Sequence, residues 1–397
     1  MARRPVRIWR AVKVLHVCGC YPPATEWGGL PAAVAGFAGA LRLADVECEV
    51  FTTSGRGSRA LPAIAPGTRD VDGTRVTYHR APDLFRSFVA PGLVPALARR
   101  AREFDLVHVH MLWAFPGIAA ARAAEWAGVP YVVSPHGALD PWSLTQWPRM
   151  KRLFLLFAED RTLRRAAFLH FTAPKEREVA PERYRALPAE IVPNVVDPEP
   201  FASLGDPARR AASQDILVLG RIHPMKGFDL LVPAMREVRR RVPAARLVVA
   251  GPDEGGYRAT VERLAREAGV AEAILFTGHL EAAARARVLE DVAILAMPSY
   301  RENFGLSAAE AMASGLPVVV SDKVNICDDV AACGAGRVVP LDVAALAAAL
   351  ADLLEDPGGR ARMGAAGRAL VREHYAPGRV AAELRAAYER AVAGEGS

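Results

Sequence analysis

Short apolar runs of strand length alternate along this chain with longer segments of helical spacing. The runs cover residues 12–18, 47–53, 105–110, 131–134, 168–172 and 190–192 in the first half, and 215–219, 246–250, 274–279, 292–297 and 318–320 in the second. Continuous apolar runs are typical of buried parallel strands, and the helices between them return the chain to the same edge of the sheet. The pattern predicts an α/β protein with two facing doubly wound domains and a cleft between them.

The same pattern gives domain limits. We expect a first domain over residues 1–198 and a second over residues 199–376, with a linker rich in Pro, Ala and Arg at 199–213. Apolar residues at helical spacing then predict a final helix within 377–397.

One stretch, from Pro298 to Pro317, combines a loop, a helix and a helix stop between two apolar runs, with Gly315 placed to end the helix. Its helix start offers unpaired backbone amides that suit an anion, and the candidates are those of Phe304, Gly305, Leu306 and Ser307. Glu302 and Glu310 are acceptor-only groups that suit the hydroxyls of a sugar or a ribose. The stretch therefore predicts a site for a hydroxyl-rich molecule carrying phosphate; a capped amphipathic helix with two solvated glutamates is the alternative.

The spacing Glu302-x(7)-Glu310, with Phe-Gly-Leu inside it and Glu-Ala-Met-Ala-Ser-Gly-Leu-Pro after it, resembles the donor-site signature of one enzyme family. This family is the retaining glycosyltransferases of the two-domain B-type fold, which include sucrose synthase and bacterial mannosyl and polysaccharide transferases. The resemblance implies Rossmann-like domains and a last helix, 377–397, that crosses back to the first domain. It also implies that Glu310 holds the nucleotide ribose and Glu302 the hydroxyls of the donor sugar.

A second motif, Gly220-Arg221-x(4)-Lys226-Gly227, follows the run 215–219. Its guanidinium fork and its ammonium group are the two cation types that suit phosphate. The family motif G-R-x(4)-K-G matches, and in that family both cations bind the donor diphosphate. A solvated basic loop is the alternative reading.

Two loops of the first half extend the resemblance. Gly28 and Gly29 follow the first apolar run, where paired glycines let the backbone approach a ligand, and the family's glycine loop there faces the donor diphosphate and the acceptor. Glu26-Trp27 stands where glycogen-synthase-like relatives carry Lys, which disfavours a glucan synthase. Ser-Pro-His136-Gly-Ala-Leu-Asp-Pro-Trp142 resembles a segment of exopolysaccharide and lipopolysaccharide transferases. In the family this histidine lies beside the reacting sugar, which places His136 there.

Three patterns that suggest metal sites are incomplete. Cys18-Gly-Cys20 has no second pair, and Asp70-Val-Asp72 runs into an Asp-Gly pair that favours a hairpin turn. His108 and His110 lie on one face of a strand without an acidic or cysteine partner nearby, so we expect them to be buried or to line the site. These patterns therefore give no complete metal site. The family resemblance implies that no metal and no further cofactor are required, with a UDP- or GDP-linked sugar as co-substrate.

Composition and charge narrow the cellular setting. The chain has 397 residues, of which 51% are hydrophobic and 24% charged, and its five cysteines argue against a disulfide framework. Neither a spanning apolar run nor a signal peptide is apparent, so we expect a cytoplasmic protein. A net charge of +6 favours anionic partners, but no basic stripe interleaved with aromatics points to nucleic acid. The segment 149–168 mixes Arg and Lys with Leu and Phe, which suits peripheral contact with an anionic inner plasma membrane face or packing against the sheet.

The resemblance, carried by matches in both halves of the chain, implies a retaining, metal-independent hexosyltransferase. It would move a sugar from a nucleotide diphosphate sugar to the hydroxyl of a glycan or polyprenyl-linked acceptor in cell-surface polysaccharide biosynthesis. Two alternatives stay open: a nucleotide-sugar epimerase, and a non-catalytic scaffold that binds nucleotide sugar.

Overall fold

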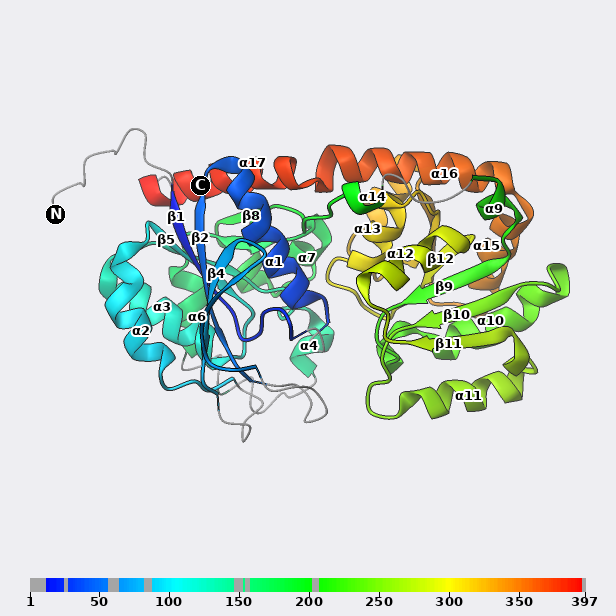
Figure 1. Ribbon diagram of the computed structural model, residues 1–397, viewed down its shortest axis with the longest axis horizontal. Helices are drawn as coiled ribbons and strands as arrows, with labels where there is room; N and C mark the ends of the chain where they lie inside the picture. Colours follow the sequence, from blue (N-terminus) through cyan, green and yellow to red (C-terminus); the bar gives the residue numbers. More distant parts are fainter. Residues whose placement is uncertain are drawn as a thin grey trace. The chain divides into compact units, whose positions relative to one another are not determined.

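The computed structural model describes residues 12–24, 28–55, 64–81, 88–145, 153, 158–201 and 207–394 (Figure 1). The chain divides into two compact units, each built around its own sheet. The amino-terminal unit comprises Met1–Val195 together with Pro377–Ser397, and the carboxy-terminal unit comprises Val196–Ala376. Both are Rossmann-like units of mixed α/β structure with parallel sheets, as the alternating pattern predicts.

The amino-terminal unit contains an eight-stranded sheet in the order β3-β4-β2-β1-β5-β6-β7-β8. Its strands are β1 Lys13–Val17, β2 Glu47–Thr53, β3 Gly67–Val71, β4 Thr74–His79, β5 Leu106–His110, β6 Tyr131–Ser134, β7 Leu169–Phe171 and β8 Ala189–Ile191. All neighbours pair in parallel except β3 and β4, which form an antiparallel hairpin. Asp72 and Gly73 are both at positive φ in its turn, and the Asp70 carboxylate accepts from the Gly73 amide at 2.8 Å. The prediction of a hairpin turn there is confirmed.

Helices cover both faces of this sheet. They are α1 Gly29–Leu41, α2 Leu93–Arg100, α3 Phe115–Ala127, α4 Pro141–Thr145, α6 Asp160–Arg165, α7 Pro174–Glu178, α8 Glu182–Arg185 and α17 Pro377–Ala393, with short 3₁₀ turns at Arg42–Ala44 and Ala101–Glu103. Leu15 and Val17 of β1 pack in a core with α2 and α3, whereas Val14 packs in a core with α1 and α17. Alternate residues of one strand thus enter two cores, which is the packing of a strand buried on both faces.

The carboxy-terminal unit contains a fully parallel six-stranded sheet in the order β11-β10-β9-β12-β13-β14. Its strands are β9 Asp215–Leu219, β10 Arg246–Ala250, β11 Ile274–Gly278, β12 Ile294–Met297, β13 Val318–Ser321 and β14 Gly336–Val339. Its helices are α9 Pro207–Ala212, α10 Phe228–Arg241, α11 Tyr257–Ala268, α12 Ala282–Asp291, α13 Leu306–Ala313, α14 Cys327–Cys333, α15 Val343–Glu355 and α16 Pro357–Leu370, with 3₁₀ turns at Glu199–Phe201, Pro224–Lys226 and Ala271–Ala273 and a π-helix at Val371–Tyr375.

The prediction of a linker at 199–213 is wrong for residues 207–212. Residues 207–212 form helix α9, and Arg210 on it donates to the backbone oxygens of Ser314 at 2.9 Å and Leu289 at 3.1 Å. Proline is tolerated at the start of a helix, and the Ala-Arg-Arg-Ala-Ala that follows is a strong helix former. The composition that suggested a linker therefore belongs to a packed helix.

Each sheet has a point where the strand order reverses. The chain moves outward from β1 to β2 and later returns to the other side of β1 as β5; likewise it moves from β9 to β10 and returns beside β9 as β12. In open α/β sheets ligands bind outside the carboxyl ends of the strands at this switch point. The loops after β9 and β12, and after β1 and β5, are therefore where a site is expected.

Candidate functional site

The loops that follow β9 and β12 pack directly against each other in the carboxy-terminal unit. The Tyr300 amide donates to the Met225 carbonyl at 2.9 Å, and a Cβ on Gly227 would lie only 2.1 Å from the Pro298 carbonyl oxygen. Gly227 also has a φ of +71°, so a larger residue would be both strained and too close. This contact brings the glycine-flanked basic motif beside the loop that carries Glu302.

The contact pairs two of the predicted site residues. The Lys226 ammonium contacts Oε1 of Glu302, and the Ser299 hydroxyl donates to the same oxygen at 3.0 Å. The two charged side chains are only 15% and 18% exposed. A partly buried ion pair is screened less than a surface pair, so each charge depends on the other when no ligand is present.

Two further carboxylates at this edge pair with arginines. Nη1 of Arg221 lies 2.6 Å from the Glu254 carboxylate, in the loop after β10. Glu310, in the second turn of α13, lies 3.2 Å from the Arg285 guanidinium on α12. Burial raises the pKa of the Glu310 carboxyl, and the Arg285 charge opposes this. The sequence does not predict that Glu254 pairs with Arg221 or that Arg285 pairs with Glu310, because the partners of each pair follow different strands or lie on different helices.

Helix α13 begins at Leu306, with Gly305 as its N-cap at a φ of +90°. The Gly305 carbonyl accepts from the amides of Ala308 and Ala309, which leaves the first-turn amides, including those of Leu306 and Ser307, without intrahelical acceptors. Gly315, at a φ of +79°, follows the helix end, so the predicted helix start and stop are both confirmed.

Phe304 and Gly305 are held by the core beneath the helix start. Phe304 is buried and packs edge-on against Tyr375, with ring centroids 5.1 Å apart. Its side chain therefore belongs to the core, and only its backbone could contact a ligand. A Cβ on Gly305 would lie 2.9 Å from Cγ1 of Val324. The position of the helix N-terminus is therefore fixed by packing on one side and by the glycine conformation on the other.

In the amino-terminal unit, Gly28 and Gly29 begin helix α1. Gly28 is the N-cap at a φ of +77°, whereas a Cβ on Gly29 would meet nothing within 4 Å. Gly28 is thus required by the backbone, and Gly29 leaves open space above the first turn. The neighbouring Glu26 and Trp27 lie outside the described residues.

His136 follows β6 in a strained turn. Its φ is +49° and that of Gly137 is +74°. Glu176, which is buried, accepts from the Gly137 amide at 2.7 Å, and its second oxygen accepts from the amide and the hydroxyl of Thr172 at 2.7 and 2.8 Å. A carboxylate with three donors holds this turn in place; nothing in the local pattern of Pro174–Glu178 distinguishes Glu176 from an exposed helix residue.

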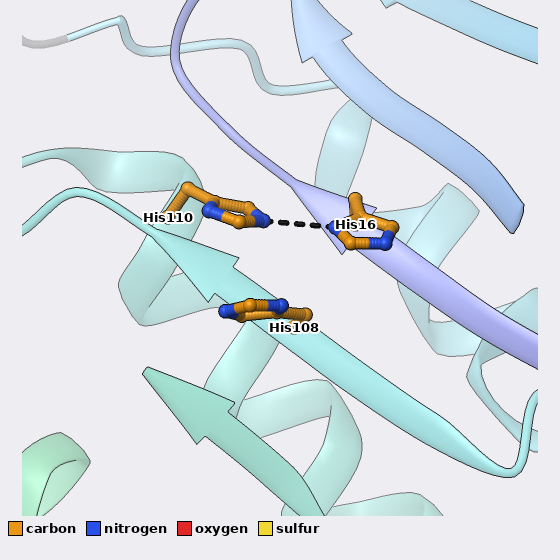
Figure 2. Close-up of side chains that lie close together, drawn as sticks. All are labelled: His16, His108 and His110. Carbon is orange, nitrogen blue, oxygen red and sulfur yellow. Dashed lines mark hydrogen bonds between the residues drawn. The ribbon is translucent and has the colours of Figure 1, made fainter. Parts of the chain in front are cut away.

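His136 also belongs to a cluster of buried or half-buried histidines. Nδ1 of His16 lies 2.8 Å from Nε2 of His110 (Figure 2). Nδ1 of His110 in turn lies 3.0 Å from Nε2 of His136. A second chain runs from the Tyr388 hydroxyl through His108, the Ser134 hydroxyl and His170 to the Val192 carbonyl. The expectation that His108 and His110 are buried is confirmed; the partner His16 comes from β1, opposite His108 in the register.

Burial keeps this cluster neutral. It lowers the pKa of His16 and of His136 to about 3, with nearby His170 adding to the effect. Burial also lowers the pKa of His170 to about 4, and it lowers the pKa values of His108 and His110 well below the usual value. At neutral pH these rings therefore interact as neutral hydrogen-bond donors and acceptors.

His16, His108 and His110 are close enough together to bind one metal ion, since one nitrogen from each lies within 4.8 Å of the others. Both nitrogens of His108 and both of His110 are already in hydrogen bonds, to Tyr388, Ser134, His16 and His136. The rings of His108 and His110 lie over one another, with centroids 4.0 Å apart (Figure 2). The geometry is that of a hydrogen-bonded network in which a metal would have to displace existing partners.

The segment 149–168, suggested for membrane contact, lies partly outside the described residues, since 149–152 and 154–157 are not described. Leu153 is exposed, and α6 begins at Asp160. Among the helices that the structure describes, none has the length and apolar character needed to cross a bilayer.

Both halves of this chain match known protein families. Residues 27–200 match the family described as Glycosyltransferase Family 4, and residues 206–370 match Glycosyl transferases group 1. The D-inositol 3-phosphate glycosyltransferase of Stackebrandtia nassauensis is 31% identical, over 91% of this chain and 87% of that protein. A GDP-mannose-dependent alpha-(1-6)-phosphatidylinositol monomannoside mannosyltransferase of Mycolicibacterium smegmatis is 29% identical, over 89% and 92% of the two chains.

Solved structures share the fold. Sucrose-phosphate synthase from Thermosynechococcus elongatus superposes with a TM-score of 0.75 at 21% identity, covering 96% of this chain and 98% of that one. Anabaena Alr3699/HepE in complex with UDP superposes with a TM-score of 0.73 at 17% identity, covering 95% and 99%. Because both halves match family models and a relative is 31% identical over 91% of this chain, the chain belongs to the glycosyltransferases of the two-domain B-type fold.

Proposed function

We propose that this chain transfers a hexose, with retention and without a metal ion, from a UDP- or GDP-sugar to an acceptor hydroxyl in cell-surface polysaccharide biosynthesis. The acceptor would be a glycan or a polyprenyl-linked sugar. The observation that carries the proposal is the Lys226–Glu302 contact at the β9/β12 switch point, beside the start of α13. Cations, a helix N-terminus and carboxylates converge there, which suits a ligand with both phosphate and hydroxyl groups.

Each group in the proposal has one task. Arg221, Lys226 and the first amides of α13 stabilise negative charge on the departing diphosphate, the task that a metal performs in other folds. When a donor phosphate binds the ammonium group of Lys226, the ion pair between Lys226 and Glu302 breaks. The Glu302 carboxylate can then accept hydrogen bonds from the hydroxyls of the donor sugar. Glu310 holds the ribose, so each carboxylate exchanges an arginine or lysine partner for hydroxyl donors.

The reaction itself needs no protein nucleophile in this proposal. The acceptor hydroxyl attacks the anomeric carbon from the face of the leaving group, and a donor phosphate oxygen takes its proton. The anomeric carbon–oxygen bond to the diphosphate breaks as the new glycosidic bond forms, so the configuration is retained. His136 supports the sugar, with Gly28 and Gly29 leaving room for the diphosphate and the acceptor.

Relatives support the substrate classes without fixing them. One solved neighbour was obtained with UDP, and one relative is named as GDP-mannose-dependent. The acceptors in the relatives' names differ: D-inositol 3-phosphate, phosphatidylinositol monomannoside and 2-deoxystreptamine. The last is the acceptor named for a Streptomyces kanamyceticus enzyme that is 28% identical over 84% of this chain and 93% of its own length. We infer that donor recognition is shared while the acceptor is set by the amino-terminal loops.

Thermal unfolding with UDP, GDP and ADP, each with and without EDTA, tests the donor site first. A nucleotide at a hundred times its dissociation constant adds about 2.7 kcal/mol, enough to raise the midpoint by several degrees. One nucleotide that raises it regardless of EDTA supports the proposal and selects the sugars to assay. No shift with any nucleotide contradicts it.

Product analysis separates the alternatives. A transferase releases free nucleotide only when an acceptor is present, whereas an epimerase yields an altered nucleotide sugar without one. Tight nucleotide binding with no turnover on any acceptor would favour the scaffold. The anomeric configuration of the product, read by NMR, tests retention directly.

Peripheral membrane contact through 149–168 is a separate proposal, supported by its mixture of basic and apolar residues. Flotation with anionic and neutral vesicles at low salt tests it. Binding to anionic vesicles alone is expected; failure to float with either would refute membrane contact and leave the transferase proposal intact.

A further inference from the structure

Three histidines form a single hydrogen-bonded chain that ends at His136. His16 on β1 contacts His110 on β5, and His110 contacts His136 in the loop after β6, at 2.8 and 3.0 Å. His16 and His110 are fully buried, whereas His136 is half-buried. The chain therefore runs from the core at the β1/β5 switch point to the loop after β6, the strand beside β5, next to the loops where the ligand of this fold is expected.

The protons along this chain must be ordered. A neutral imidazole carries one N–H and one lone pair, so His110, which uses both nitrogens, must donate on one side and accept on the other. Two directions satisfy this rule. In the first, protons point inward and His16 is left with a buried N–H at Nε2; in the second, protons point outward and Nε2 of His16 is left with a lone pair.

The inner end of the chain decides between the two directions. Nε2 of His16 is buried and has no hydrogen-bond partner among the described residues. A buried N–H without an acceptor is rarer in proteins than an acceptor without a donor, which favours the outward direction. Nδ1–H of His16 then donates to Nε2 of His110, and Nδ1–H of His110 donates to Nε2 of His136.

We propose that His110 and His16 are positioning residues that hold the proton of His136 on Nδ1, so that His136 presents a neutral N–H to an acceptor oxygen of the bound ligand. Nδ1 of His136 has no partner among the described residues, and its strained backbone is held through Gly137 by Glu176. Which oxygen it meets rests on the proposed function, where it is a hydroxyl oxygen of the donor sugar. In this arrangement the lone pair of His136 is occupied, so the residue donates and does not serve as a base.

Burial supports this assignment, because it lowers the pKa of His136 to about 3 and keeps the ring neutral. A charged ring would donate from both nitrogens and could not accept from His110. The network would then lose its outer hydrogen bond.

Nitrogen-15 NMR of the full chain with labelled histidine tests the assignment, because long-range nitrogen–proton correlations distinguish the two tautomers. His136→Asn identifies the His136 signals. The expected result is a neutral ring with its proton on Nδ1. A proton on Nε2, or a charged ring at pH 7.5, would overturn the proposal; since the unmodified protein gives this answer, no variant has to fold for the test to decide.

A variant pair then tests positioning. His110→Phe keeps a ring over His108 but removes both nitrogens, so His136 should become a mixture of tautomers. The matched control, Ser134→Ala, removes the hydroxyl between His108 and His170 and leaves the three-histidine chain intact, so the proton should stay on Nδ1. An unchanged His136 signal in a folded His110→Phe protein would contradict the proposal.

Turnover measurements separate this proposal from the proposed function. His110→Phe should lower kcat about tenfold, the effect of one misplaced neutral hydrogen bond, while nucleotide affinity stays unchanged. If His136→Ala keeps full activity while the Nδ1 tautomer is observed, the sugar contact is refuted and the positioning stands. If the tautomer is wrong, the positioning fails whatever the activity.

Discussion

The Lys226 ammonium contacts the Glu302 carboxylate although 76 residues separate them in the chain. The two side chains come from the loops after β9 and β12, the strands on either side of the switch point. In the absence of ligand the two charges satisfy each other in a partly buried position. Binding of a phosphate and a hydroxyl together would give each a new partner, whereas either group alone would leave one charge unpaired.

Replacing Lys226 with Ala should lower turnover on the order of a hundredfold, because a positioned cation that stabilises developing negative charge has effects of this size. Steady-state kinetics with the donor selected by thermal unfolding measures it. Lys323→Ala is the matched control, since the Lys323 side chain is half exposed and pairs with Asp322 at 2.9 Å. Full activity of Lys226→Ala would refute the assignment.

Replacing Glu310 with Gln should weaken nucleotide binding through the ribose. A hydrogen bond to a charged acceptor contributes about 1.5–3 kcal/mol, so affinity should fall by roughly one to two orders of magnitude. A 2′,3′-dideoxynucleotide, which lacks the ribose hydroxyls, should bind the variant and the unmodified protein alike. Calorimetric titration of both ligands measures the difference, and equal losses for the two ligands would place Glu310 away from the ribose.

The elements of this fold were predictable where the signal is local. The apolar runs 215–219 and 246–250 coincide with β9 and β10, and the glycine at 315 follows the end of α13 as predicted. Apolar strand runs and glycine stops are decided by a few neighbouring residues, so the sequence alone reveals them. The linker prediction failed because α9 is short and its composition also occurs in loops.

The partners inside the candidate site were not predictable in the same way. His16 meets His110 across 94 residues, and Glu176 meets Gly137 across 39. Such contacts depend on the order of strands in the sheet, which local patterns do not encode. An isolated histidine in an apolar run gives no sign that a second strand will place another ring against it.

Replacing Gly305 with Ala should distort the backbone at the start of α13, because the alanine would be strained by the positive φ and its Cβ would also clash with a neighbouring side chain. A non-glycine residue at positive φ costs about 1–2 kcal/mol, and the new Cβ would also lie 2.9 Å from Cγ1 of Val324. Gly334→Ala is the matched control, because Gly334 has a φ of +71° and nothing within 4 Å of a new Cβ.

Both variants should unfold more easily in urea, but only Gly305→Ala should lose nucleotide affinity. Equal nucleotide affinity in the two proteins would show that the geometry of the α13 start does not matter for binding.

The amino-terminal unit should lose stability as the pH falls below about 6.5. Burial lowers the pKa of every histidine in this unit, namely His16, His79, His108, His110, His136 and His170. The unfolded chain binds protons at these groups near pH 6.5 and the folded unit does not, so the stabilisation is full above that pH and is lost as the pH falls through the lowered pKa values, which are about 3 to 4 for His16, His136 and His170. Each proton contributes a slope of up to about 1.4 kcal/mol per pH unit.

One buried carboxyl acts in the opposite direction. Burial raises the pKa of Glu159 to about 7, so below that pH the folded unit binds a proton that the unfolded chain takes up only at lower pH. A single carboxyl does not offset six histidines between pH 6.5 and 4.5, and the net slope remains destabilising with acid.

Tryptophan fluorescence isolates this effect, because all six tryptophans lie before residue 148 and none in the carboxy-terminal unit. The urea midpoint should fall clearly from pH 7.5 to pH 5.5. His170→Phe removes one buried titrating ring and should reduce this fall, whereas His279→Ala, at an exposed position in the other unit, should not change it. Equal midpoints at the two pH values would contradict the prediction. They would mean that the folded and unfolded chains bind protons at these histidines alike, as expected for solvent-exposed rings.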